Sequence, residues 1–337
     1  MGEVAIKKYT FKDFQSDQEV RWCPGCDDYV ILRSMLKALP EMEVKKEDVV
    51  FISGIGCSSR FPYYVDSYGI HGIHGRAAAI ASGVKLANPN LSVWVTTGDG
   101  DAMAIGGNHF IHVLRRNLDM NIVLFNNEIY GLTKGQFSPT SLLGQKTKSS
   151  PYGNIQPPFQ PGELAIGARA RFFARIGGNT PKEMTQLFVQ AEKFKGTSLI
   201  EILQNCVIFN DGCYTKYTDK AVKDDQQLHV EHGEPMIFGK EKNKGLVLDG
   251  LSLKVVTIGE EGITKEDILI HDAKCENDVM HHMLIKLNYP LVTGIIRSVE
   301  EKTFEDRVFE LAEEVKSNSK FRKVDDLFHS GEIYEVK

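Results

Sequence analysis

Short apolar runs alternate with amphipathic stretches through the first 210 residues of this chain. The runs are five or six residues long, which is typical of strands buried on both faces. Between them, apolar residues recur at helical spacing, and Pro40 and Asn88-Pro89 end two of these stretches. The alternation predicts an α/β fold, a mostly parallel sheet with helices on both faces. The expected strands are residues 49–53, 91–96, 121–125, 172–176 and 198–203, and the expected helices are 27–39, 75–87, 102–116 and 180–195.

The alternation stops at residues 128–162, which are rich in Gly, Pro, Ser, Thr and Gln and have no sustained period. Loops longer than roughly 15 residues in a compact domain are usually functional or disordered. We interpret this loop as folding over a ligand. From about residue 210 the sequence is charged and irregular, with short strand-like pieces and two later amphipathic helices. We therefore expect a domain at 1–210 and a C-terminal extension at 211–337 that packs on this domain or on a partner chain.

Two threonines precede expected helices. Thr180, followed by Pro181 and then Glu183, has the spacing of a capping box with proline at the first helical position. Thr303 precedes an amphipathic stretch and is expected to cap it.

Composition restricts the class of protein. The 337 residues are 42% hydrophobic and 25% charged, with a net charge of −5, which gives no general attraction for nucleic acid or anionic membranes. No apolar run approaches the ~18 residues of a membrane span, and residues 1–8 lack the apolar core of a secretion signal. We expect a cytoplasmic protein with no nucleic acid or membrane among its partners.

The chain has six cysteines, which in a reducing compartment indicate metal binding or catalysis before disulfides. Cys23 and Cys26 flank a Pro-Gly turn that directs both sulfurs the same way. Cys57 and Cys206 follow two of the expected strands, so their thiols should lie at one edge of the sheet. Four thiolates typically hold a [4Fe-4S] cluster. Structural zinc is the alternative, although it usually brings two close C-x-x-C pairs.

The segment Gly98-Asp99-Gly100-Asp101 lies where an expected strand meets a helix. The Asp99 carboxylate should therefore project at the carboxyl edge of the sheet, the usual ligand crevice of such folds. Gly98 and Gly100 let the backbone approach a phosphate, and the next helix directs amide hydrogens at it. Asn127 ends the following strand and offers a second oxygen. Since Mg²⁺ prefers oxygen ligands shared with phosphates, these residues predict a magnesium-diphosphate site.

Gly-Asp-Gly followed one crossover later by Asn-Asn resembles the signature of thiamine diphosphate enzymes. Over roughly residues 15–215 the chain is similar to the beta subunits of 2-oxoacid:ferredoxin oxidoreductases, in particular the 2-oxoglutarate group. The segments that carry this resemblance are Cys23-Pro24-Gly25-Cys26, Gly54-Ile55-Gly56-Cys57-Ser58-Ser59, His74-Gly75-Arg76, Gly98-Asp99-Gly100-Asp101, Asn126-Asn127-Glu128-Ile129-Tyr130-Gly131-Leu132-Thr133 and Gln204-Asn205-Cys206.

The resemblance implies a thiamine diphosphate-binding fold and assigns residues to it. Magnesium would be bound by Asp99, the Asn127 side chain and the Ile129 carbonyl, and His74 and Arg76 would be catalytic. Asp27 stands where the family often has glycine, which is expected to alter the hydrogen bonding and potential of the cluster. The implied cluster ligands are Cys23, Cys26, Cys57 and Cys206, and the implied cofactor-binding residues are Gly56, Ser58, His74, Gly75, Gly98, Asp99, Gly100, Asp101, Asn127, Ile129, Gly131, Leu132 and Thr133.

The resemblance also implies an activity. It is the oxidative decarboxylation of 2-oxoglutarate, or a related 2-oxo acid, with coenzyme A to acyl-CoA and CO₂, electrons passing through the [4Fe-4S] cluster to ferredoxin. In resembling enzymes the glutamate that activates thiamine comes from an alpha subunit. We therefore expect the chain to work as an αβ or (αβ)₂ assembly and to be inactive alone. The alternatives are a non-oxidative thiamine diphosphate-dependent 2-oxo acid decarboxylase subunit and a zinc-stabilised, non-catalytic assembly subunit.

Overall fold

A computed structural model describes residues 8–334 and 336 of the chain. The residues on which the expectation about a secretion signal mainly rests, 1–7, lie outside the described part. Eight strands form the central sheet in the order β2-β1-β3-β4-β6-β5-β11-β7, and all neighbours run parallel except β5 and β11. The strands are β1 (Val49–Ser53), β2 (Tyr68–His71), β3 (Ser92–Gly98), β4 (Met120–Asn126), β5 (Phe172–Gly177), β6 (Thr197–Leu203), β7 (Gln227–Val230) and β11 (Leu291–Ser298).

The five expected strands are confirmed as β1, β3, β4, β5 and β6, each within one or two residues of the predicted bounds. The sequence pattern missed β2 because all four of its residues are exposed at the edge of the sheet, so it has no buried apolar run. β7 and β11 also join this sheet, although both lie beyond residue 210. A separate antiparallel sheet contains β8 (Ile237–Phe238), β9 (Lys244–Asp249) and β10 (Ser252–Thr257).

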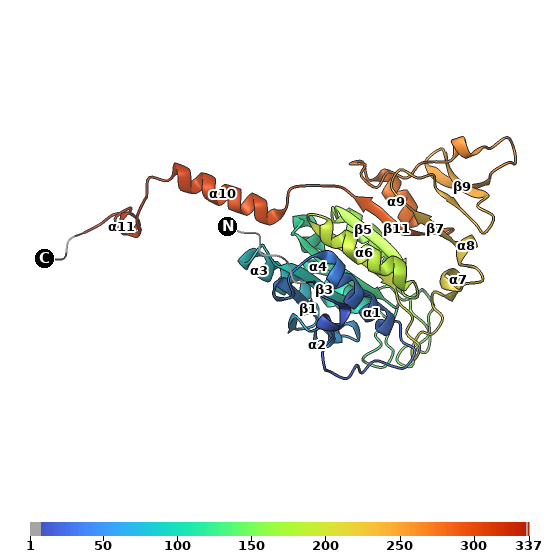
Figure 1. Ribbon diagram of the computed structural model, residues 1–337, viewed down its shortest axis with the longest axis horizontal. Helices are drawn as coiled ribbons and strands as arrows, with labels where there is room; N and C mark the ends of the chain where they lie inside the picture. The colour runs from blue at the N-terminus through green and yellow to red at the C-terminus, as the bar shows by residue number, and fades with distance from the viewer. Residues whose placement is uncertain (1–7, 335, 337) are drawn as a thin grey trace.

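Helices cover both faces of the central sheet, as predicted (Figure 1). Successive strand residues point to opposite faces, so Phe51 joins the core under α1 (Asp28–Ala38) and α6 (Pro181–Lys193), while Val50 joins the other core. The helices of that second face are α3 (Ala77–Ala87), α4 (Gly107–Arg116), α5 (Pro161–Gly167) and α9 (Val279–Lys286). Short helices occur at α2 (Phe61–Tyr64), α7 (Thr215–Thr218) and α8 (Lys223–Gln226).

The two predicted helix caps have different outcomes. Thr180 precedes α6 with Pro181 in the first turn, but its hydroxyl donates to the Gly177 carbonyl at 2.8 Å and accepts no cap hydrogen bond. The predicted capping box is therefore wrong, because the hydroxyl bonds backward to the end of β5. The Thr303 prediction is confirmed, since its Oγ1 accepts the Asp306 amide at 3.2 Å.

The chain ends in an arm formed by α10 (Phe304–Asn318) and α11 (Val324–Phe328), which extends away from the sheet (Figure 1). Its base is fixed to the start of β4, where the Phe304 amide donates to Asn117 and a Glu305 oxygen accepts the Asp119 amide. Beyond this base, Leu311 is 60% exposed. Among the described residues, no helix combines the length and apolar character needed to cross a membrane.

Candidate cofactor and cluster site

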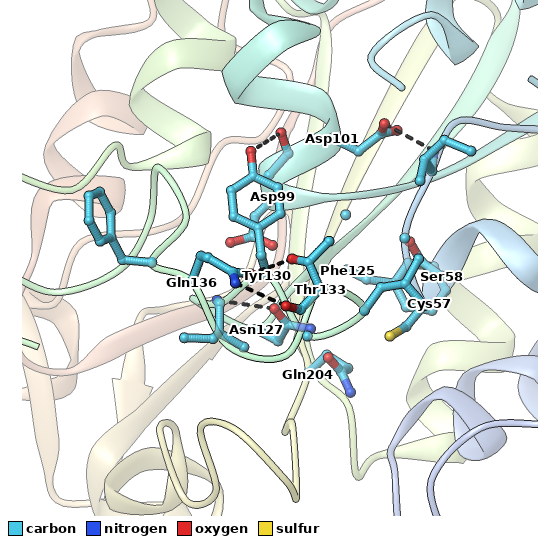
Figure 2. Close-up of a pocket in the computed structure, with 18 of the residues that line it drawn as sticks. Cys57, Ser58, Asp99, Asp101, Phe125, Asn127, Tyr130, Thr133, Gln136 and Gln204 are labelled. Atoms are coloured by element: carbon cyan, nitrogen blue, oxygen red, sulfur yellow. Dashed lines mark hydrogen bonds between the residues drawn. The ribbon is translucent and has the colours of Figure 1, made fainter. Parts of the chain in front are cut away.

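A cavity of about 620 Å³ lies at the carboxyl ends of β1, β3, β4 and β6 (Figure 2). This is the sheet edge where the sequence placed the diphosphate site. The predicted residues that line the cavity are Gly56, Cys57, Ser58, His74, Gly98, Asp99, Gly100, Asp101, Asn127, Ile129, Gly131, Leu132 and Thr133. Segments as far apart in sequence as Gly56 and Thr133 therefore meet at one site, because parallel strands present their carboxyl ends together.

Asp99 is 2% exposed, and burial raises its carboxyl pKa to about 6. Its Oδ2 atom accepts hydrogen bonds from Ser138 and Thr140, both in the long loop. No hydrogen bond from a described side chain reaches Oδ1. The loop thus docks on one carboxylate oxygen and makes no side-chain hydrogen bond to the other. The contacts of Ser138 and Thr140 were not predicted, because nothing in their spacing indicates contact with Asp99, about forty positions earlier.

Asp101 is also buried, but its carboxylate is occupied by protein donors. It accepts the Gly75 amide at 2.7 Å, the Ile55 amide at 3.1 Å and the Thr97 hydroxyl at 2.7 Å, and His74 Nδ1 lies 2.6 Å away. Asp101 therefore joins the loop after β1, the turn before α3 and the end of β3. Asp101 therefore positions His74 and Gly75.

Close packing explains why glycine follows both Asp99 and His74. A Cβ atom on Gly100 would lie 2.2 Å from the ring of Tyr130, whose hydroxyl donates to the Gly100 carbonyl at 3.0 Å. Gly75 has a φ of +70°, and a Cβ there would lie 2.6 Å from the Gly106 amide nitrogen.

Asp101 begins a π-helical turn, Asp101–Ile105, that replaces the first turn of the expected helix 102–116.

The Asn127 oxygen accepts the Ile129 amide at 3.2 Å, which sets the turn after β4. Thr133 and Gln136 bond to each other across the next turn, with Gln136 Nε2 at 2.9 Å from the Thr133 carbonyl. Arg76 does not line the cavity, because its Nη1 atom contacts the carbonyls of Gly75 and Ile105 instead.

Gly131 lies between the diphosphate segment and two of the predicted cluster ligands. A Cβ atom on Gly131 would lie 3.5 Å from the Cys206 sulfur and 3.7 Å from the Cys57 sulfur. Gln204 Nε2 donates to the Cys26 sulfur at 3.2 Å. Burial, followed by the negative charge of Asp28, raises the pKa of the Cys26 and Cys57 thiols, Cys57 to about 12. Because these pKa values also respond to Cys23 and Cys206, the four thiols share one region.

This spacing bears on the zinc alternative. All six cysteines are free, and no three His, Cys, Asp or Glu side chains among the described residues are close enough to hold one metal ion. A single zinc would need sulfurs at about 2.3 Å from it. The thiols of Cys23, Cys26, Cys57 and Cys206 share one region, but no three of them are placed to bind a single zinc ion.

Two acidic residues follow Cys26. Asp27 Oδ2 accepts the Asn205 amide at 2.8 Å, so it ties the segment after Cys26 to the segment before Cys206. Gly178 leaves room for this carboxylate, because a Cβ there would lie 2.6 Å from Asp27 Oδ2. Asp28 is 1% exposed and lines the cavity, its Oδ2 has no hydrogen-bond partner, and burial raises its pKa to about 7.

Comparisons with known proteins agree with this geometry. Residues 54–202 match the model of the thiamine pyrophosphate enzyme C-terminal TPP binding domain. The chain is 48% identical over 299 residues to the 2-oxoglutarate oxidoreductase subunit KorB of Mycobacterium tuberculosis, covering 88% of this chain and 79% of that protein. It is 45% identical over 185 residues to the 2-oxoglutarate synthase subunit KorB of Archaeoglobus fulgidus, covering 55% of this chain and 69% of that protein.

A solved structure is also similar over the full length. It is 2-oxoglutarate:ferredoxin oxidoreductase from Magnetococcus marinus with 2-oxoglutarate, coenzyme A and succinyl-CoA bound, with a TM-score of 0.78, 29% identity and 98% coverage of both chains. The chain therefore belongs to the beta subunits of the 2-oxoacid:ferredoxin oxidoreductases, thiamine diphosphate-binding proteins of the group that includes the 2-oxoglutarate enzymes.

Proposed function

We propose that this chain binds magnesium and thiamine diphosphate beside a [4Fe-4S] cluster and, with an alpha subunit, oxidatively decarboxylates 2-oxoglutarate with coenzyme A. The products are succinyl-CoA and CO₂, and ferredoxin accepts the electrons. The observation that carries the proposal is the position of Gly131. Its neighbours Leu132 and Thr133 line the cofactor cavity, while its own Cα borders the sulfurs of Cys57 and Cys206.

The residues present fit a magnesium ion. Asp99 would contribute Oδ1, Asn127 its side-chain oxygen and Ile129 its carbonyl, all at the lining of one cavity. These are hard oxygen donors of the kind that Mg²⁺ shares with phosphates. Ser138 and Thr140 hold the other Asp99 oxygen and so fix the direction of the carboxylate.

The cysteines fit a cluster better than a single ion. Cys57 lines the cavity and the other three thiols lie in the same region, yet no three possible ligands among the described residues converge on one metal position. A [4Fe-4S] cluster takes one thiolate at each of four separated irons. Ligation by iron would also supply the positive charge that the buried thiols need to ionise.

Thiamine diphosphate, when bound, would supply the nucleophilic carbanion and the electron-accepting ring for 2-oxo acid decarboxylation. The chain's own residues orient it. Asp99 and the glycines beside it hold the diphosphate end, Asp101 fixes His74 at the cavity wall, and Phe125 and Ile129 exclude water from the lining. A cluster beside Gly131 would receive electrons within the same cavity.

We include an alpha subunit because no glutamate among the described residues lines the cavity to activate the thiamine ring. The acidic residues of the lining are Asp28, Asp99 and Asp101. Asp99 would bind magnesium, and Asp101 already accepts four protein donors. Asp28 keeps one unpartnered oxygen, but it lies beside the thiols, where its charge raises the pKa of Cys26. We also infer a cytoplasmic location, which the six free cysteines support.

The test is anaerobic purification of the chain with its alpha partner. We expect about four irons and four sulfides per chain, and reduction of methyl viologen that requires 2-oxoglutarate and coenzyme A. Cys206→Ser should lower the iron content, and Asp99→Asn should remove thiamine diphosphate binding while iron remains. Zinc in place of iron, or decarboxylation without electron transfer, would contradict the proposal.

A further inference from the structure

A second cavity, of about 250 Å³, lies behind the end of β4 and shares no lining residue with the cofactor cavity. Alternate strand residues face opposite sides. Accordingly Phe125 and Asn127 line the cofactor cavity, and Asn126 and Glu128 line the second one. The remaining walls come from the long loop, β5, β6, α5, α7, the end of α9 and the segment that leads from it into β11. The two cavities are therefore back to back across the Asn-Asn segment.

Buried donors without partners face this second cavity. Arg175 lines it and is 3% exposed, and only its Nε atom is paired, with Glu201 at 2.7 Å. No hydrogen bond joins its two terminal nitrogens to a described residue. The Tyr214 side chain is 8% exposed, and its hydroxyl faces Glu128 without meeting hydrogen-bond geometry. Buried polar groups of this kind are normally hydrogen-bonded.

Three acidic residues line the cavity, and two of them are engaged by protein groups. Glu201 accepts Arg175 Nε and the Asn126 side-chain amide, and Glu163 lies 3.7 Å from Lys286. The third, Glu128, faces the Tyr214 hydroxyl, and burial raises its carboxyl pKa to about 7. Lys216, at the exposed mouth, rests on the Tyr217 ring at 4.6 Å and forms no ion pair with a described residue within 4 Å. Beside Glu128, the open positions are donors: two guanidinium nitrogens, a phenol and an ammonium group.

We propose that this second cavity binds a small carboxylate anion between Arg175, Tyr214 and Lys216. The paired terminal nitrogens of a guanidinium match the two oxygens of a carboxylate. The hydroxyl of Tyr214 and the ammonium of Lys216 would complete the recognition. The cavity volume suits an acid of a few carbons and is too small for a nucleotide cofactor.

The test uses the αβ enzyme and isothermal titration calorimetry, with succinate as the carboxylate and inorganic phosphate as the competing oxyanion. Tyr214→Phe and Lys216→Met each remove one donor and should weaken succinate binding about tenfold. Arg175 is left intact because its loss would leave the buried Glu201 charge without its partner. Tyr152→Phe and Lys220→Met are the matched controls, since both residues are exposed and lie outside either cavity.

The site is supported if the two cavity variants weaken succinate and the two controls do not. If Tyr214→Phe and Lys216→Met both leave succinate binding unchanged, succinate binds elsewhere and the proposal is overturned. A wild-type Kd weaker than about 10 mM would also overturn it, since the cavity would then hold water alone. Tighter binding of phosphate than of succinate would overturn the choice of carboxylate. Because the variants avoid the cofactor cavity, failure here leaves iron content and cofactor binding as separate tests.

Discussion

At the scale of single residues, Gly131 connects the two halves of the site. It lines the cofactor cavity, and its Cα faces two predicted cluster ligands. Its φ lies outside the left-handed region, so the backbone itself accepts a side chain there. What glycine provides is space beside the sulfurs.

Gly131→Ala should therefore fold and yet lose cluster. Its methyl group would make ordinary contacts, 3.5 Å and 3.7 Å, with the sulfurs of Cys206 and Cys57 in the apo chain, and the free energy of unfolding should change by less than about 1 kcal/mol. An inserted cluster would compete for that space, so iron and sulfide per chain should fall at least about twofold. Chemical analysis and the visible spectrum measure this. Gly107→Ala, with no atom within 4 Å of its Cβ position, is the control, and equal iron in both variants would refute the argument.

At the scale of elements, the long loop is attached to the sheet through a buried polar chain. Thr140 contacts Asp99 and also the Asn126 oxygen at 3.0 Å, and Asn126 donates to Glu201, the partner of Arg175. One loop hydroxyl thus connects the magnesium anchor with the ion pair of β5 and β6. Ser138, on Asp99, and Ser141, on the Glu128 carbonyl, attach the same loop beside it.

Thr140→Val keeps the shape of the side chain and removes its hydroxyl. The change removes the one hydroxyl proton that the buried oxygens of Asp99 and Asn126 share, which should cost about 1–3 kcal/mol of stability. It should also weaken magnesium and thiamine diphosphate binding about tenfold, as followed by calorimetry. Thr147→Val, in the same loop but bonded only to Ser149 and Ser150, should bind normally. A normal affinity in Thr140→Val would show that the loop docks without this hydroxyl.

α9 is held by a neutral histidine. His281 is fully buried, with Nε2 at 2.9 Å from the Asp272 carbonyl and Nδ1 at 2.9 Å from Arg297 Nη1. Nε2 therefore donates, Nδ1 accepts, and a second proton would face the guanidinium. Burial is the main cause that lowers the His281 pKa. As the pH falls, the imidazole of the unfolded chain, with a pKa of about 6.5, is protonated before that of the folded chain. The contribution of His281 to stability is therefore present above about pH 6.5 and is lost as the pH falls below it.

The free energy of urea unfolding should accordingly show this loss below about pH 6.5, with a slope of at most about 1.4 kcal/mol per pH unit. The raised carboxyl pKa values of Asp28, Asp99 and Glu128 have the opposite effect, because these groups favour the folded state as the pH falls. The decisive observable is therefore the difference between wild type and His281→Gln, which should be less stable near neutrality but show a smaller loss on acidification. Parallel pH profiles for the two proteins would contradict the neutral-histidine assignment.

At the scale of the whole molecule, the chain leaves two features that its own fold does not complete. One is the cofactor cavity, whose lining includes no glutamate among the described residues to activate the thiamine ring. We expect the isolated chain with magnesium and thiamine diphosphate to show no turnover of 2-oxoglutarate, and addition of the alpha subunit to restore it. Methyl viologen reduction measures this, and steady turnover by the chain alone would refute the requirement.

The other feature is the C-terminal arm, which we propose packs on the alpha subunit. Val308, Leu311 and Val315 recur at helical spacing on α10 and are 38%, 60% and 61% exposed. Leu311→Glu should leave the melting temperature of the isolated chain unchanged and reduce its co-purification with the alpha subunit. Glu313→Gln on the same helix is the control. Retention of the full complex by Leu311→Glu would show that the arm contacts something else.

Local signals determined much of the fold and of the proposed site in advance. Strands buried on both faces carry unbroken apolar runs, so β1, β3, β4, β5 and β6 were predictable. Asp99 and Asn127 were predictable for a related reason, because they end two of those strands and parallel strands end at one edge. The exposed edge strand β2 has no such run, and β7 and β11 join the sheet from a segment whose pattern is irregular.

Strand periodicity and chain order set where each chemical group emerges, so the groups at the sheet edge could be predicted from the residues alone. How those groups are used depends on the folded arrangement. It assigned one oxygen of Asp99 to the loop hydroxyls, committed Asp101 to four protein donors, turned Arg76 away from the cavity and opened a second cavity behind Asn126. These outcomes depend on contacts between side chains far apart in the chain, and no local pattern encodes such distances.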